Sequence, residues 1–137
     1  MKALLIAVSI AFTLPAAAQT MQPGEWQFTT TMGTSFTPKP QTAVVTECIS
    51  PEDAKDPTRF TGAEQAKGCK VTPGARSTES YSWTVSCPDQ GLNGEGKLKF
   101  GAATIESDVR MTMEMDGRKV EMTSHTAGRL LGPCKPK

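Results

Sequence analysis

The stretch from Ile105 to Thr126 constrains the fold of this chain more than any other, because its side chains alternate in character. Apolar residues take every second position of its first half, with polar residues between them; they are Val109, Met111, Met113 and Met115. This period of two is typical of a strand with one buried face, whereas a helix needs apolar residues at a period near 3.6. Asp116-Gly117 then predicts a two-residue turn, in which both residues need a positive φ.

A hairpin built on this turn has a predicted register. Counting outward from the turn pairs Met115 with Arg118, Glu114 with Lys119, Met113 with Val120 and Met111 with Met122. Opposite charges then meet on one face and apolar side chains on the other, as cross-strand pairs favour. A slip by one residue would break both matches, so the sequence predicts this register and no other.

The rest of the chain predicts short strands joined by turns and one short helical excursion. We expect strands at 24–32, 41–49, 69–72, 79–87 and 97–100, loops at 33–40 and 88–96, a turn at Pro73-Gly74 and a tail at 128–137. Ser50 and Pro51 predict a helix start, and Thr61 to Glu64 repeats the capping pattern, so the excursion lies between Cys48 and Cys69. The predicted fold class is all-β, an antiparallel meander of about seven short strands in a barrel-like or strongly curved sheet.

The N-terminus has the features of an export signal. A positive start at Lys2 is followed by an apolar run from Ala3 to Leu14 and by small residues at 16–18. The run is shorter than the roughly 20 residues of a membrane span, so we favour a signal peptide over an uncleaved anchor. We predict residues 1–18 as the signal peptide, cleavage after Ala18, and a periplasmic β domain at 19–137 with no membrane span.

The charge of the predicted mature chain is balanced. The whole chain has 15 basic and 14 acidic side chains, and removal of Lys2 leaves 14 of each. A nucleic-acid or anionic-lipid partner would call for a basic stripe, which the sequence lacks.

Four cysteines, Cys48, Cys69, Cys87 and Cys134, lie in the predicted exported part. An even number in an oxidising compartment indicates two disulfides, and the wide spacing argues against zinc, whose cysteine ligands usually come in close pairs. Three pairings are possible. We favour Cys48–Cys69 with Cys87–Cys134, since the first would close the helical excursion and the second would hold the tail.

Several short motifs follow one another in a recognisable order. They are Pro23-Gly24-Glu25-Trp26, Cys48-Ile49-Ser50-Pro51-Glu52, Cys69, Trp83-Thr84-Val85-Ser86-Cys87, Gly94-Glu95-Gly96, Met111 to Met115 and Gly132-Pro133-Cys134. This order resembles a secreted proteobacterial family known mainly as a domain of unknown function. The resemblance covers essentially the whole mature chain. It implies a periplasmic, disulfide-bonded β domain and no activity.

The methionines and aromatic residues are the candidate functional residues. The inward-facing set of Trp26, Phe28, Trp83, Met111, Met113 and Met122 is predicted to line a site for a small ligand or to fill the interior. Thioethers also bind Cu(I), so a copper site formed by Met111, Met113, Met115 and Met122 is the alternative to ordinary core packing.

The predicted register puts His125 across from Asp108, which suggests either part of a hydrolytic triad or a surface ion pair. The sequence has no marked nucleophile and no G-x-S-x-G motif, so we predict no enzyme and no resident cofactor. The expected function is a non-catalytic module for a small apolar or amphipathic ligand, or for an envelope protein that meets an edge strand or the 33–40 loop. A Met-based Cu(I)-binding protein is the alternative.

Overall fold

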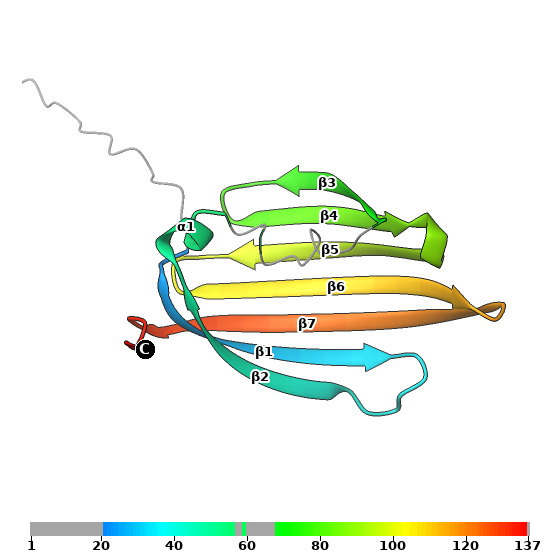
Figure 1. Cartoon of the computed structure of the whole chain (residues 1–137), viewed down its shortest axis with the longest axis horizontal. Helices are drawn as coiled ribbons and strands as arrows, with labels where there is room; N and C mark the ends of the chain where they lie inside the picture. The colour runs from blue at the N-terminus through cyan, green and yellow to red at the C-terminus, as the bar shows by residue number, and fades with distance from the viewer. Residues whose placement is uncertain (1–20, 57–58, 60–67, 137) are drawn as a thin grey trace, which may run out of the picture.

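One antiparallel sheet makes up most of the protein. The computed structural model describes residues 21–56, 59 and 68–136. The described strands are β1 (Gly24–Thr34), β2 (Gln41–Ile49), β3 (Lys70–Arg76), β4 (Ser80–Cys87), β5 (Leu92–Phe100), β6 (Thr104–Met115) and β7 (Arg118–Gly132). They lie in the order β2-β1-β7-β6-β5-β4-β3 (Figure 1). The predicted all-β meander is confirmed, and the predicted signal peptide lies outside the described residues.

The β6–β7 hairpin has the predicted register. Met111 lies opposite Met122, Met113 opposite Val120, and Glu114 opposite Lys119. Asp116 and Gly117 have φ values of 50° and 72°, the left-handed conformation that the predicted turn requires. Because this hairpin forms the middle of the sheet, its register also fixes which side chains share each face.

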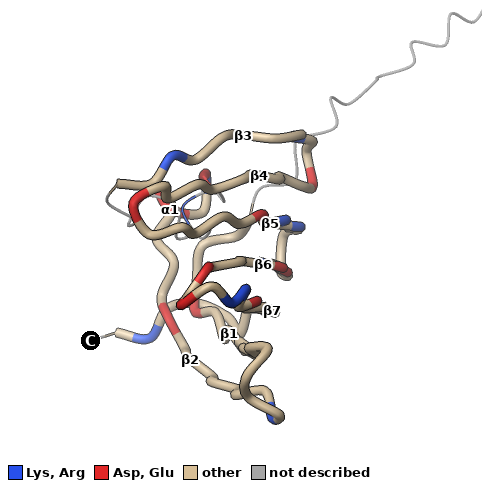
Figure 2. Tube along the Cα trace, turned by 90° about the vertical axis from the view of Figure 1, so that its right-hand side faces the viewer, with Lys and Arg blue, Asp and Glu red and all other residues tan. Residues whose placement is uncertain are grey.

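The sheet is strongly curved and stays open. β2 and β3 are its two edges, and α1 (Pro51–Ala54) lies to one side of the stacked strands (Figure 2). Within the described part of the chain, no helix has the length and apolar character to cross a membrane.

The hydrophobic core lies on the face that α1 covers. Trp26 has no exposed surface, and it packs in one cluster with Trp83, Leu98 and Ile105. The Trp26 indole N–H donates to the carbonyl of Gln22 at 3.0 Å, so the polar end of this buried ring is satisfied. Met21, Ile49 and Ala54 complete the cluster from outside the central strands. We call this side of the sheet the apolar face.

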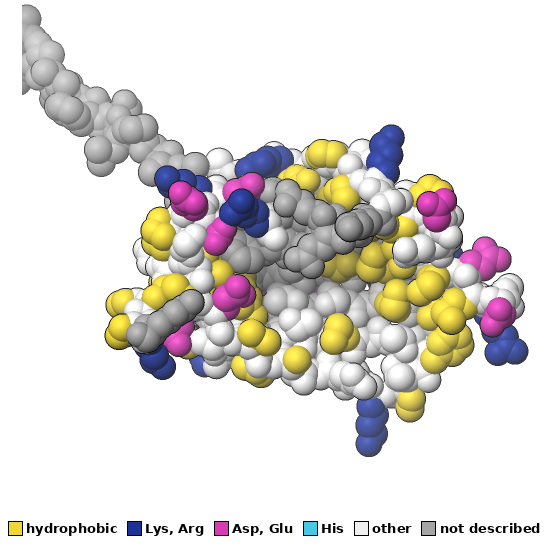
Figure 3. Space-filling model, in the orientation of Figure 1, with side chains coloured by type: hydrophobic (Ala, Val, Ile, Leu, Met, Phe, Trp, Pro, Cys, Tyr) yellow, Lys and Arg dark blue, Asp and Glu magenta, His cyan; other side chains and the backbone are white. Residues whose placement is uncertain are grey.

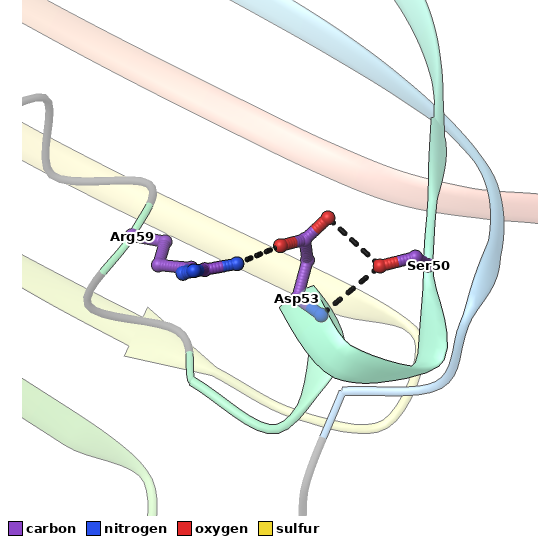
Figure 4. Close-up of polar contacts among 3 residues, drawn as sticks. All are labelled: Ser50, Asp53 and Arg59. Carbon is purple, nitrogen blue, oxygen red and sulfur yellow. Dashed lines mark hydrogen bonds and ion pairs between the residues drawn. The ribbon is translucent and has the colours of Figure 1, made fainter.

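Helix α1 begins as the sequence predicts. The Ser50 hydroxyl accepts from the backbone N–H of Asp53 at 3.2 Å and donates to the Asp53 carboxylate at 2.8 Å (Figure 4). Arg59 forms an ion pair with the same carboxylate. The Ser50 hydrogen bond and then Arg59 lower the pKa of Asp53 below its ordinary value. The second predicted helical turn, Thr61 to Glu64, lies outside the described residues.

The predicted loop at 88–96 is wrong in its second half. Only Pro88–Gln90 forms a 3₁₀ turn, and β5 already begins at Leu92. Two glycines lie inside this strand because side chains of the neighbouring strand β4 occupy the space that a larger side chain would need. A Cβ on Gly96 would come within 2.1 Å of the Trp83 ring, and one on Gly94 within 3.0 Å of Val85.

Two other segments, which the sequence predicts as a turn and a tail, are also part of strands. Pro73-Gly74 lies within β3, at an edge that tolerates the missing proline N–H, and a bulge follows it before Arg76. The predicted tail from Gly128 onward continues β7 to Gly132, because β1 pairs along this whole segment.

The two disulfides form, but the favoured pairing is wrong. The bonds are Cys48–Cys134 and Cys69–Cys87, with Cα atoms 5.5 and 4.2 Å apart. Glu25 of β1 lies between Cys48 of β2 and Gly132 of β7, so sheet order brings the last cysteine to the first. Cys69 and Cys87 flank the paired residues of the β3–β4 hairpin and therefore meet across it.

Candidate functional site

A hollow of about 320 Å³ lies on the apolar face and extends from β5 to the edge strand β2. Its lining residues combine apolar side chains with hydroxyls; they are Phe28, Thr30, Val45, Glu47, Leu98, Ile105, Ser107, Val109, Ser124 and Thr126. Figure 3 shows this face, with hydrophobic side chains spread across it and charged side chains mostly around its rim. The hollow therefore brings hydrocarbon and polar groups together on one face of the sheet.

The hydroxyls form a row across three adjacent strands. Thr30 of β1 lies opposite Thr126 of β7, which lies opposite Ser107 of β6. The Thr30 and Thr126 hydroxyl oxygens are 2.9 Å apart and share a hydrogen bond. Ser124 adds a fourth hydroxyl two residues along β7. Each hydroxyl can donate as well as accept, so the row offers hydrogen bonds to a polar group placed above it.

Apolar side chains surround this row. Phe28 and Val109 are half-buried, and Leu98 on the same face is fully buried. Val45 of β2 is 56 % exposed at the outer side, next to the Glu47 carboxylate. A bound molecule would thus contact hydrocarbon at the walls and hydroxyls at the centre.

The predicted lining residues divide into three groups. Trp26 and Trp83 are 0 % and 3 % exposed and pack in the core. Phe28 stacks on Trp26 with ring centroids 6.2 Å apart and lines the hollow. Met111, Met113 and Met122 are half-buried further along the same face, toward the hairpin turn. The hydroxyl residues of the row were not among the predicted lining residues, although their alternation with residues of the opposite face places them on the apolar face.

The methionines form a separate cluster. Met111 and Met122 are direct cross-strand partners, and Met113 lies two residues from Met111 on the same face. Leu92 of β5 flanks Met113. Figure 3 shows hydrophobic side chains gathered over this end of β5 and β6. We call Met111, Met113 and Met122 the thioether cluster.

The opposite face carries the predicted histidine pair. The His125 Nδ1 atom lies 2.7 Å from an Asp108 carboxylate oxygen, and Nε2 lies 3.7 Å from a Glu106 oxygen. All three side chains are exposed, in or beside a trough of about 670 Å³. Ser82 lines the same trough, but two strands separate β4 from β7, which puts Ser82 about 14 Å from His125. This serine is too far away to be activated by the imidazole.

Comparison with known proteins gives a family and no activity. A family model described as "Protein of unknown function (DUF3617)" matches residues 21–134. This match confirms the resemblance to a domain of unknown function. No curated protein and no solved structure matches the chain.

Proposed function

Since the chain belongs to this family of unknown function, which supplies no activity to carry over, we propose from the geometry that it is a non-catalytic module that binds a small amphipathic molecule on its apolar face. The observation that carries the proposal is the row of hydroxyls within apolar walls. Small-ligand sites typically combine an apolar lining with a few polar groups that fix orientation. The volume of about 320 Å³ is at the lower end of the range for such sites, so the ligand is a short chain or a single ring.

The disulfides support export as part of this proposal. Disulfides persist in oxidising compartments and are rare in the cytosol. Both described bonds join segments that the sheet already brings together. We therefore infer that the module acts in the periplasm.

Two adjacent threonines give a matched test of the binding site. Thr30 lines the hollow, whereas Thr29 belongs to the same strand and points to the opposite face. We expect 1-octanol to raise the thermal midpoint of the wild type and of Thr29→Val, and to raise that of Thr30→Val much less. A parallel native mass spectrum would report a one-to-one adduct. Equal responses of both variants would contradict binding at the hydroxyl row.

The thioether cluster supports a second candidate, Cu(I) binding. Thioethers are soft ligands that select Cu(I), and Met111 and Met122 lie directly opposite each other on one face. Their half-exposed side chains are accessible to an ion, and Met113 supplies a third sulfur two residues along β6. Ordinary packing of flexible side chains is the competing explanation for the same residues.

A titration with Cu(I) and a competing chelator separates these explanations. The Met111→Leu/Met113→Leu double variant keeps the apolar volume and removes two sulfurs, and should bind Cu(I) at least tenfold more weakly than the wild type. Met21→Leu is the control, because Met21 is 2 % exposed and packs in the core cluster with Trp26, away from the hairpin. Unchanged affinity in the double variant would assign the methionines to packing alone.

A further inference from the structure

The two edges of the sheet differ in how well they resist pairing with another strand. β3 has seven residues, and it carries Pro73 and a bulge before Arg76, features that block or distort an incoming strand. β2 has nine residues in regular register with β1 and contains no proline, lysine or bulge. Its first eight residues are exposed, with Val44 and Val45 at 59 % and 56 %. Such an edge is a template for strand addition.

We propose that β2 pairs antiparallel with β2 of a second copy of this chain, about a two-fold axis at Ala43. In an antiparallel pair the numbers of opposed residues have a constant sum, so this axis sets Gln41 opposite Val45 of the partner and Thr42 opposite Val44. An even sum keeps the faces in phase, so the two apolar faces join on one side. The contact is isologous and closes as a dimer.

Charge complementarity favours this axis, and it favours a second copy of this chain as the partner. Glu47 lies within β2 and Lys39 lies two residues before its start, and each is four positions from Ala43. The two-fold sets 41–45 of the two copies opposite each other as strand, and it places Lys39 of each copy, in the bend just before β2, within side-chain reach of Glu47 of the other. The pairing also affects the hollow, because Val45 and Glu47 line its outer side. The second copy would supply the wall that a single sheet leaves open.

Charge reversal with rescue tests the proposal on the full mature chain. Native mass spectrometry and light scattering over about 1 to 500 µM should show a concentration-dependent dimer. Lys39→Glu alone or Glu47→Lys alone turns two attractive contacts into two repulsive ones and should weaken dimerisation about tenfold. The double variant Lys39→Glu/Glu47→Lys should return to the wild-type dissociation constant, because the swapped charges meet again only if the partner is an identical chain.

A cysteine on the proposed axis gives an independent readout. Ala43→Cys should form an intermolecular disulfide on mild oxidation, because the two copies of residue 43 are direct partners. Ala127→Cys is the control, since Ala127 is also exposed but lies on β7 in the middle of the sheet. A wild type that stays monomeric throughout, a double variant that is not rescued, or equal cross-linking of both cysteine variants would overturn the proposal.

Discussion

Removal of the Cys48–Cys134 disulfide should lower the free energy of unfolding by about 4.6 kcal/mol. The two cysteines are 86 residues apart in sequence, and the chain-entropy relation converts a loop of this length into about 15 cal/mol/K, or about 4.6 kcal/mol at 25 °C. Cys48 is exposed and Cys134 is half-buried, so alanine at both positions removes little packing. The measured loss therefore reports on the cross-link itself. It is a large fraction of the roughly 5–15 kcal/mol that stabilises a typical domain.

Urea unfolding of the Cys48→Ala/Cys134→Ala variant, followed by circular dichroism, measures this loss. The m-value, which is the slope of the unfolding free energy against urea concentration, should also rise, because the unfolded chain without the link exposes more surface. Cys69→Ala/Cys87→Ala gives the comparison. Its loop of 18 residues yields only about 3.2 kcal/mol from chain entropy, and buried Cys87 adds a packing loss. A loss below about 2 kcal/mol for Cys48→Ala/Cys134→Ala would refute the entropy argument. A non-reduced peptide map that joins Cys48 to Cys69 would refute the pairing.

Three smaller perturbations test local packing and capping. Gly96→Ala should cost about 1–3 kcal/mol in urea unfolding, because its Cβ would meet the Trp83 ring at 2.1 Å. Gly33→Ala, with its nearest contact at 3.3 Å, should cost less, and an equal cost would contradict the packing described. Ser50→Ala should cost about 1 kcal/mol through loss of the helix cap, as seen in thermal unfolding. The lowered pKa of Asp53 means that its ionised form adds stability above pH 3.8, and that this contribution is lost as the pH falls through the lower folded value. Asp53→Asn should remove that part of the acid dependence, and identical acid profiles for variant and wild type would contradict it.

Short-range chemistry could be predicted from the sequence. The Asp116-Gly117 turn and the alternation around it set the register from Met111–Met122 outward, because both depend only on neighbouring residues. The cap at Ser50 is local in the same sense. Each of these features needs no knowledge of which strand lies next to which.

Long-range pairing could not be predicted in the same way. Gly94 and Gly96 suggest a loop until the Trp83 ring is known to lie over them. Gly128 suggests a tail until β1 is known to pair with β7. The Cys69–Cys87 bond could have been predicted, because a turn centred near residue 78 sets these two cysteines opposite each other. The Pro73-Gly74 dipeptide instead suggested a turn earlier in the chain.

The disulfide and the exposed edge act on the same strand. β2 buries only Ile49, at the end next to Cys48, so apolar burial contributes little to holding the rest of the strand on β1. The backbone ladder and the Cys48–Cys134 bond must supply most of that stability. Loss of the bond should therefore release β2 at temperatures at which the hairpin of β6 and β7 stays folded. Hydrogen exchange would show this as faster exchange confined to 41–49. A uniform increase across the sheet would mean that β2 unfolds only with the whole domain.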